Sequence, residues 1–100
     1  MRYNKTTLQK IETLFGEIGY TVRYEKGNFN SGYCIVEQRK MAIVNKFFEV
    51  EARINTLVDI LSFVAVPTET LTEDSQKTWK QVTALWRVTE QQGTNEGTTT

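Results

Sequence analysis

Residues 27–61 read GNFNSGYCIVEQRKMAIVNKFFEVEARINTLVDIL and carry the clearest structural signals in the chain. Two short apolar runs, 33–36 and 41–44, flank the polar residues 37–40, which have the length of a hairpin connection. From Glu49 to Phe63, apolar residues recur at the spacing of one helix face. The stretch therefore predicts a glycine-gated loop, a β-hairpin and an amphipathic helix.

The apolar runs of this hairpin are continuous and do not alternate with polar residues. Continuous apolarity is typical of a strand that is covered on both faces. We therefore expect helices on one face of the sheet and something else, such as a partner chain, on the other. Cys34 lies in the middle of the first run, so we expect it to be a buried, unreactive apolar residue.

The chain before the hairpin predicts a helix followed by a strand. Apolar residues from Thr6 to Ile18 recur every three or four positions. Thr6 and Gln9 match a capping box, and Gly19 stands where the chain leaves the helix. Residues 20–25 alternate apolar and polar side chains, which predicts a half-buried first strand.

Two short segments offer candidate binding residues. Phe29 and Asn30 lie in the glycine-rich loop, where Phe29 either plugs the end of the core or is presented to a ligand. Lys46, Phe47 and Phe48 precede the second helix, and two adjacent rings cannot easily both face one core. We expect one of the two phenylalanines to be buried and the other to be partly exposed.

The second helix carries charges near its start. Glu49 and Arg53 are four residues apart, the spacing at which a glutamate and an arginine form an ion pair on a helix surface. We therefore expect the two side chains to pair.

A third helix is predicted to begin at Thr72. Trp79, Val82 and Trp86 form an apolar stripe on it, and this stripe needs a cover. The cover is either the face of the protein's own sheet or the same helix of a second copy.

Together these elements predict an α+β fold in the order α-β-β-β-α-α, with a small antiparallel or mixed three-stranded sheet covered by helices. We assign residues 1–90 to a single domain. Residues 91–100 contain no apolar side chain and are expected to be a disordered tail.

Composition excludes several classes of chemistry. The chain has no histidine and a single cysteine, which is too few ligands for an ordinary zinc site and leaves no imidazole for a catalytic triad. No acid–base pair follows from spacing, so we expect no enzyme, no metal and no cofactor. No apolar run approaches the roughly 20 residues that span a bilayer. We expect a cytoplasmic protein without membrane contact.

The motifs SGYC (31–34), VNKFF (44–48) and RINTL (53–57) resemble those of a set of short uncharacterised bacterial proteins, over roughly residues 5–65. More distantly, the order of elements is similar to the minimal zinc-peptidase core of the ImmA/IrrE family. That family carries H-E-x-x-H on the helix after the hairpin, whereas this chain has Val58, Asp59 and Ser62 in the best register. The resemblance implies such a fold without its zinc site.

These observations favour a self-associating or protein-binding module that forms a dimer or binds an unknown protein. The candidate binding surface consists of Phe29, Asn30, Lys46, Phe47, Phe48, Trp79 and Trp86. The alternative is a domain that binds single-stranded nucleic acid through a small basic-aromatic sheet face. Its residues would be Arg2, Lys5, Phe29, Tyr33, Arg39, Lys40 and Lys46. The balance of 12 basic and 12 acidic residues speaks against nucleic acid.

Overall fold

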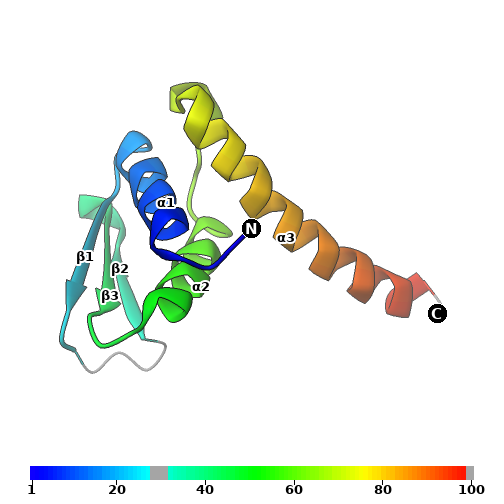
Figure 1. Ribbon diagram of the computed structural model, residues 1–100, viewed down its shortest axis with the longest axis horizontal. Helices are drawn as coiled ribbons and strands as arrows, with labels where there is room; N and C mark the ends of the chain where they lie inside the picture. Colours follow the sequence, from blue (N-terminus) through cyan, green and yellow to red (C-terminus); the bar gives the residue numbers. More distant parts are fainter. Residues whose placement is uncertain (28–31, 99–100) are drawn as a thin grey trace.

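The computed structural model describes the backbone of residues 1–27 and 32–98, and the side chains of residues 1–27 and 32–86. The elements follow the predicted α+β order (Figure 1). They are α1 (Lys5–Glu17), β1 (Thr21–Glu25), β2 (Tyr33–Val36), the short 3-10 helix η1 (Glu37–Arg39), β3 (Met41–Asn45), α2 (Val50–Leu61), the short 3-10 helix η2 (Thr68–Thr70) and α3 (Glu73–Thr98).

The three strands form one mixed sheet in the order β1-β3-β2. β2 and β3 pair antiparallel through η1, which confirms the predicted hairpin. β1 pairs parallel with β3. The last strand in the chain is therefore central, and its residues Ala42 and Val44 are fully buried. β1 and β2 form the two edges.

The boundaries of α1 follow from local hydrogen bonds. The N-cap is Asn4, whose side-chain oxygen accepts a hydrogen bond from the amide of Thr7 at 2.9 Å. The predicted capping box from Thr6 is therefore wrong, because Thr6 lies within the first turn and the side chain of Asn4 caps the helix by accepting from one amide of that turn. Gly19 takes a φ of 88° after the helix, as predicted.

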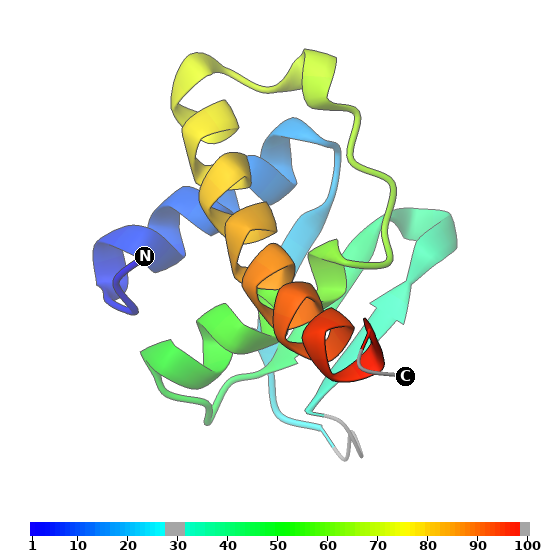
Figure 2. The ribbon, with the colours of Figure 1, turned by 90° about the vertical axis from the view of Figure 1, so that its right-hand side faces the viewer.

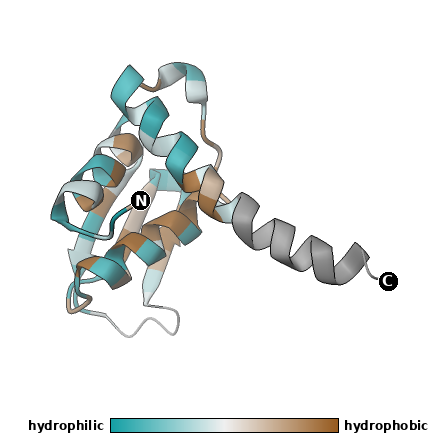
Figure 3. Ribbon diagram, turned by 45° about the vertical axis from the view of Figure 1, so that its right-hand side comes forward, coloured by the Kyte–Doolittle hydropathy of each residue, from teal (hydrophilic) through white to brown (hydrophobic). Residues whose placement is uncertain are grey.

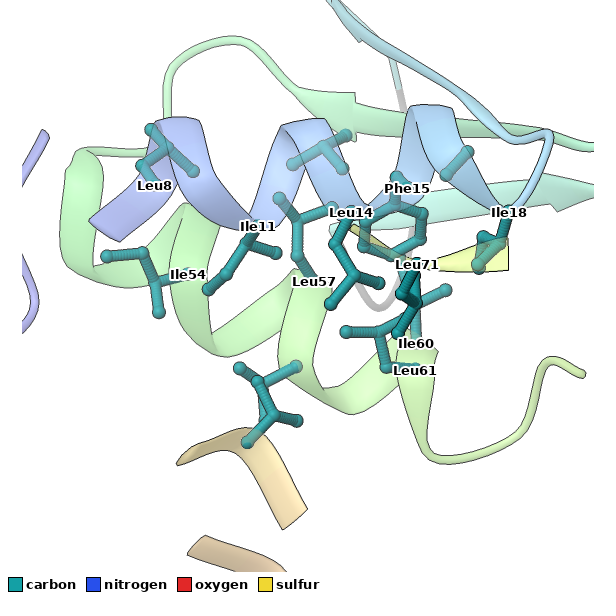
Figure 4. Packing of buried hydrophobic residues seen from close by; sticks show 14 residues of the cluster. Leu8, Ile11, Leu14, Phe15, Ile18, Ile54, Leu57, Ile60, Leu61 and Leu71 are labelled. Atoms are coloured by element: carbon teal, nitrogen blue, oxygen red, sulfur yellow. The ribbon is translucent and has the colours of Figure 1, made fainter. Parts of the chain in front are cut away.

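The helices lie in two layers on one side of the sheet (Figures 1 and 2). α1 and α2 cover the sheet, and the core lies between them: Leu8, Ile11 and Leu14 of α1 point toward Ile54 and Leu57 of α2 (Figure 4). α3 crosses the far side of these two helices. Hydrophobic residues gather where α1, α2 and the middle of α3 approach one another (Figure 3).

The apolar stripe of α3 packs on its own chain. Val82 is fully buried, and Trp79 and Trp86 are half-buried against the core. The stripe thus has a contact within its own chain, but this contact is not with the face of the sheet, and further cover by a second copy stays a prediction. The contact is with the layer of α1 and α2, while the sheet lies beyond that layer.

The other face of the sheet is not covered by any helix or strand among the described residues. Alternation along the strands directs eight side chains to this outer face. They are Thr21, Arg23, Glu25, Cys34, Val36, Met41, Ile43 and Asn45. The expected cover of the second face therefore does not come from the described part of the chain, and its cover by a partner chain stays a prediction.

Cys34 is half-buried on this outer face, so the prediction of a buried cysteine is also wrong. It stands opposite Ile43, whereas its neighbours Tyr33 and Ile35 pack against the core. Side chains around Cys34 are apolar on both faces of the strand, so the sequence does not distinguish the two faces. The pairing of β2 with β3 shows which face the helices cover.

Within the described residues, no helix is both long enough and apolar enough to cross a membrane. The sequence predicts a disordered tail at residues 91–100, whereas the described backbone of residues 91–98 belongs to α3, and residues 99 and 100 lie outside the described residues. Phe29 and Asn30 of the glycine-rich loop lie outside the described residues as well.

Candidate functional site

The predicted binding residues fall in separate parts of the fold. Lys46, Phe47 and Phe48 lie in the turn between β3 and α2. Trp79 and Trp86 lie on α3, which is on the far side of the layer of α1 and α2 from the sheet (Figure 1). These five residues therefore do not form one surface.

In the turn between β3 and α2, the two phenylalanines point in different directions, as predicted. Phe47 is 67% exposed, and the Nζ atom of Lys46 lies 5.4 Å from the centre of its ring. Phe48 is half-buried and packs against the core. Its ring lies directly over Gly32 at the start of β2. Phe48 thus joins this turn to the sheet.

Arg53 holds the same turn from α2. Its Nε atom donates to the carbonyl of Phe48 and its Nη2 atom donates to the carbonyl of Lys46, both at 2.9 Å. The predicted ion pair between Glu49 and Arg53 is therefore wrong, because the guanidinium group is occupied by backbone carbonyls. Sequence spacing did not show this role, since the turn carbonyls come near the helix only in the folded chain.

The guanidinium group of Arg53 also lies over the ring of Tyr24 in β1, 4.2 Å from its centre. The hydroxyl of Tyr24 donates to the carboxylate of Glu12 in α1. Burial, and then this hydrogen bond to a carboxylate, raise the pKa of Tyr24 well above its usual range. The chain of contacts links α1, β1 and α2, and Tyr24 stays neutral in it, so we assign it to stability.

On α3, Trp79 and Trp86 contact each other. Their ring centres are 5.5 Å apart with an interplanar angle of 82°, an edge-to-face arrangement. Both rings also pack against the core. Their main contacts are therefore internal.

A polar groove of about 410 Å³ lies between α1 and α3. Lys10 and Lys77 line it together with hydroxyl groups of α3. The hydroxyl of Thr78 donates to the carbonyl of Asp74 at 3.3 Å, and the amide of Ser75 donates to the hydroxyl of Thr72 at 3.3 Å. These hydrogen bonds belong to the start of α3, where Asp74 also lines the groove.

Strand β2 is the feature that sequence reasoning missed. It is an edge strand, it contains no charged residue, and all four of its side chains, Tyr33 to Val36, are partly exposed. The opposite edge differs, because β1 carries Arg23 and Glu25, which form an ion pair at 2.8 Å. Charged side chains of this kind keep an edge strand from pairing with other chains. Of the two edge strands in the described part of the chain, β2 is the one that lacks this protection.

Phe63 adjoins the same edge. It is 53% exposed and stacks on Tyr33, with ring centres 6.3 Å apart. Because Tyr33 packs against the core, Phe63 lies on the side of the sheet that the helices cover. Apolar side chains thus flank the β2 edge on both faces of the sheet: Phe63 on one, and Cys34 with Val36 on the other.

The described residues contain no group of three or more cysteine, aspartate or glutamate side chains that is arranged to hold a metal ion. The described residues offer an apolar strand edge and the exposed ring of Phe47, in a turn that Arg53 holds by two hydrogen bonds. Comparison of the chain with protein-family models, with curated proteins and with solved structures finds no match.

Proposed function

We propose that this protein is a small non-enzymatic module that associates with protein, either a second copy of itself or another chain, through the edge strand β2. The observation that carries the proposal is the contrast between the two edges of the sheet. β2 is apolar, uncharged and partly exposed along its whole length, whereas β1 bears the Arg23–Glu25 ion pair.

Edge strands recognise proteins through their backbone. An incoming strand takes up the unbonded amides and carbonyls of the edge, and side chains on the two faces supply specificity. β2 meets the second need, because Cys34 and Val36 offer apolar contacts on the outer face and Phe63 offers them on the other. A charged or twisted edge would meet neither.

Nucleic-acid binding receives less support. A sheet that binds single strands stacks bases on aromatic rings of its exposed face. Among the described residues, the outer face of this sheet carries no aromatic side chain, and Tyr33 packs toward the helices. Arg23 is the cation of that face, and it is paired with Glu25.

Sedimentation velocity over a wide range of concentration tests the proposal, together with the binding of a labelled peptide that reproduces residues 32–37. We expect the mass to rise above the chain mass of 11.5 kDa, or the peptide to bind, or both. Val36→Lys should weaken either association about tenfold or more, because it places a charge on the apolar edge. Thr21→Lys places the same charge on the outer face at the other edge, and should change neither.

A wild-type protein that stays monomeric at every concentration and does not bind the peptide would overturn the proposal. Equal effects of Val36→Lys and Thr21→Lys would also count against it, because they would show a response to charge alone.

A further inference from the structure

We infer that β2 pairs antiparallel with β2 of a second copy about a two-fold axis that passes between the two Ile35 residues. This pairing joins the two three-stranded sheets into one sheet of six strands. This inference rests on the proposed function, and it specifies the partner and the register. The backbone hydrogen bonds of the sheet determine which groups of β2 are available for this pairing.

Hydrogen bonds on both sides of β3 show which groups of β2 point outward. The amide of Asn45 donates to the carbonyl of Gly32 at 2.9 Å, so the pair 32 and 45 is hydrogen-bonded. Antiparallel pairs alternate between bonded and non-bonded, so Cys34 and Val36 direct their amides and carbonyls to β3. Ile35 then directs its amide and carbonyl away from β3, toward the edge.

The bonds to β1 agree with this alternation. The amide of Thr21 donates to the carbonyl of Lys40 at 2.8 Å, and the amide of Lys46 donates to the carbonyl of Glu25 at 3.1 Å. The even-numbered residues of 40–46 therefore direct their amides and carbonyls to β1, and the odd-numbered residues direct theirs to β2. Among the described residues, no group accepts from the outward amide of Ile35 or donates to its carbonyl.

The edge of a second copy has a donor and an acceptor that match those of this edge, without any change in either chain. The amide of Ile35 in each copy can donate to the carbonyl of Ile35 in the other, which satisfies both groups of both residues. No charged side chain lies within Tyr33–Val36, so two identical edges meet without the like-charge repulsion that opposes most self-pairing. The β1 edge carries the Arg23–Glu25 ion pair and lacks this property.

The two-fold symmetry then determines which residues of the two copies face each other. A two-fold axis that makes adjacent strands antiparallel stands perpendicular to the sheet, so the helices of both copies lie on one face. With Ile35 on the axis, Cys34 faces Val36 of the second copy in a non-bonded pair, with their Cα atoms about 4.5 Å apart. On the helix side, the second copy covers the half-exposed ring of Phe63.

The pairing is short, so the association is weak. One bonded pair at the axis and a few apolar side chains fall below the area of a standard protein interface. We therefore expect a dimer whose population depends strongly on concentration.

Disulfide trapping tests the register. In Val36→Cys, the native Cys34 of one copy faces the introduced thiol of the other, within the Cα separation that a disulfide requires. Oxidation with diamide, which takes up the two electrons and two protons of the thiol pair, should link most of the dimer on a non-reducing gel. The wild type should link at least tenfold more slowly, because its two Cys34 residues are diagonal neighbours about 7–8 Å apart.

Two control variants test whether the disulfide forms between position 34 of one copy and position 36 of the other. Val36→Cys combined with Cys34→Ser should lose the rapid link, because the introduced thiols are also diagonal neighbours. Thr21→Cys, which retains Cys34 and lies on the same face at the other edge, should not link. If Val36→Cys loses its cooperative melt, Val36→Lys in sedimentation serves in its place, with a loss of dimer about tenfold or more expected.

The outcomes separate the register from the proposed function. A dimer in sedimentation without rapid linking of Val36→Cys would overturn the inference and leave the proposed function standing. So would a monomer that binds the strand peptide. Wild-type protein that links as fast as Val36→Cys would place Cys34 on the axis and overturn the register. A monomer that binds no peptide would overturn both.

Discussion

The ring of Phe48 occupies the space in which any residue other than glycine at position 32 would place its first side-chain carbon. A Cβ atom on Gly32 would lie 2.3 Å from Cζ and 2.7 Å from Cε2 of Phe48. Gly32 also has a φ of 85°, a conformation that other residues rarely adopt. One glycine thus permits both the turn into β2 and the packing of the turn before α2.

Gly32→Ala should lower the free energy of unfolding by about 2–4 kcal/mol, from backbone strain together with overpacking. Urea unfolding measures the loss. Gly19→Ala is the matched control, because Gly19 has a φ of 88° but its nearest contact would be 3.8 Å away. It should cost about 1–2 kcal/mol, the strain alone. Equal losses of unfolding free energy in the two variants would show that the ring of Phe48 moves away from the added methyl group without destabilising the protein.

Arg53→Lys should destabilise the protein by about 1–3 kcal/mol even though the charge is kept. An ammonium group cannot reach the carbonyls of Lys46 and Phe48 with the planar fork of a guanidinium while it stacks on Tyr24. Chemical unfolding at neutral pH measures the loss. Arg23→Lys, at an exposed ion pair, should change stability by less than about 0.5 kcal/mol. A loss no larger for Arg53→Lys than for Arg23→Lys would contradict the assigned role.

Glu17 should make stability depend on acid pH. Its carboxylate accepts from the amide of Thr72 at 2.9 Å, and this hydrogen bond holds the pKa of Glu17 below its ordinary value of 4.5. A lowered pKa in the folded state stabilises the protein above the unfolded value, and the contribution is lost as pH falls through the folded value. Because the carboxylate is largely exposed, the contribution should not exceed about 1 kcal/mol.

The comparison of wild type with Glu17→Gln at pH 7 and at pH 3 isolates this effect from other carboxylates. The wild type should be the more stable at pH 7, and the difference should shrink at pH 3. Glu69→Gln, at an exposed position without a hydrogen bond to the described residues, should show no such trend. A difference that grows as pH falls would reverse the assigned sign.

Trp79→Ala should lower the free energy of unfolding by about 2–4 kcal/mol at every protein concentration, because the ring packs against the core and against Trp86. The mass in solution should match that of the wild type at the same concentration. Lys80→Ala, exposed on the same helix, is the control and should have little effect on stability. A Trp79→Ala variant with unchanged stability and a lower mass would instead make the stripe an interface.

Much of the fold follows from local patterns in the sequence. The apolar faces of α1 and α2, the glycine that ends α1 and the hairpin of β2 and β3 depend on residues close together in the chain. Helical spacing shows which side of a helix is apolar, and the two short apolar runs with their polar connection show the hairpin. The opposite orientations of Phe47 and Phe48 follow in the same way, since adjacent rings diverge.

The candidate binding edge depends instead on pairing between residues far apart in the chain. The parallel contact of β1 with β3 makes β3 central and leaves β2 at the edge, and no local pattern in Tyr33–Val36 distinguishes an edge strand from a central one. Which face the helices cover is equally non-local, so Cys34 was predicted to be buried and lies half-exposed on the outer face. A continuous apolar strand has the same pattern on both sides, and only tertiary packing determines which side is covered.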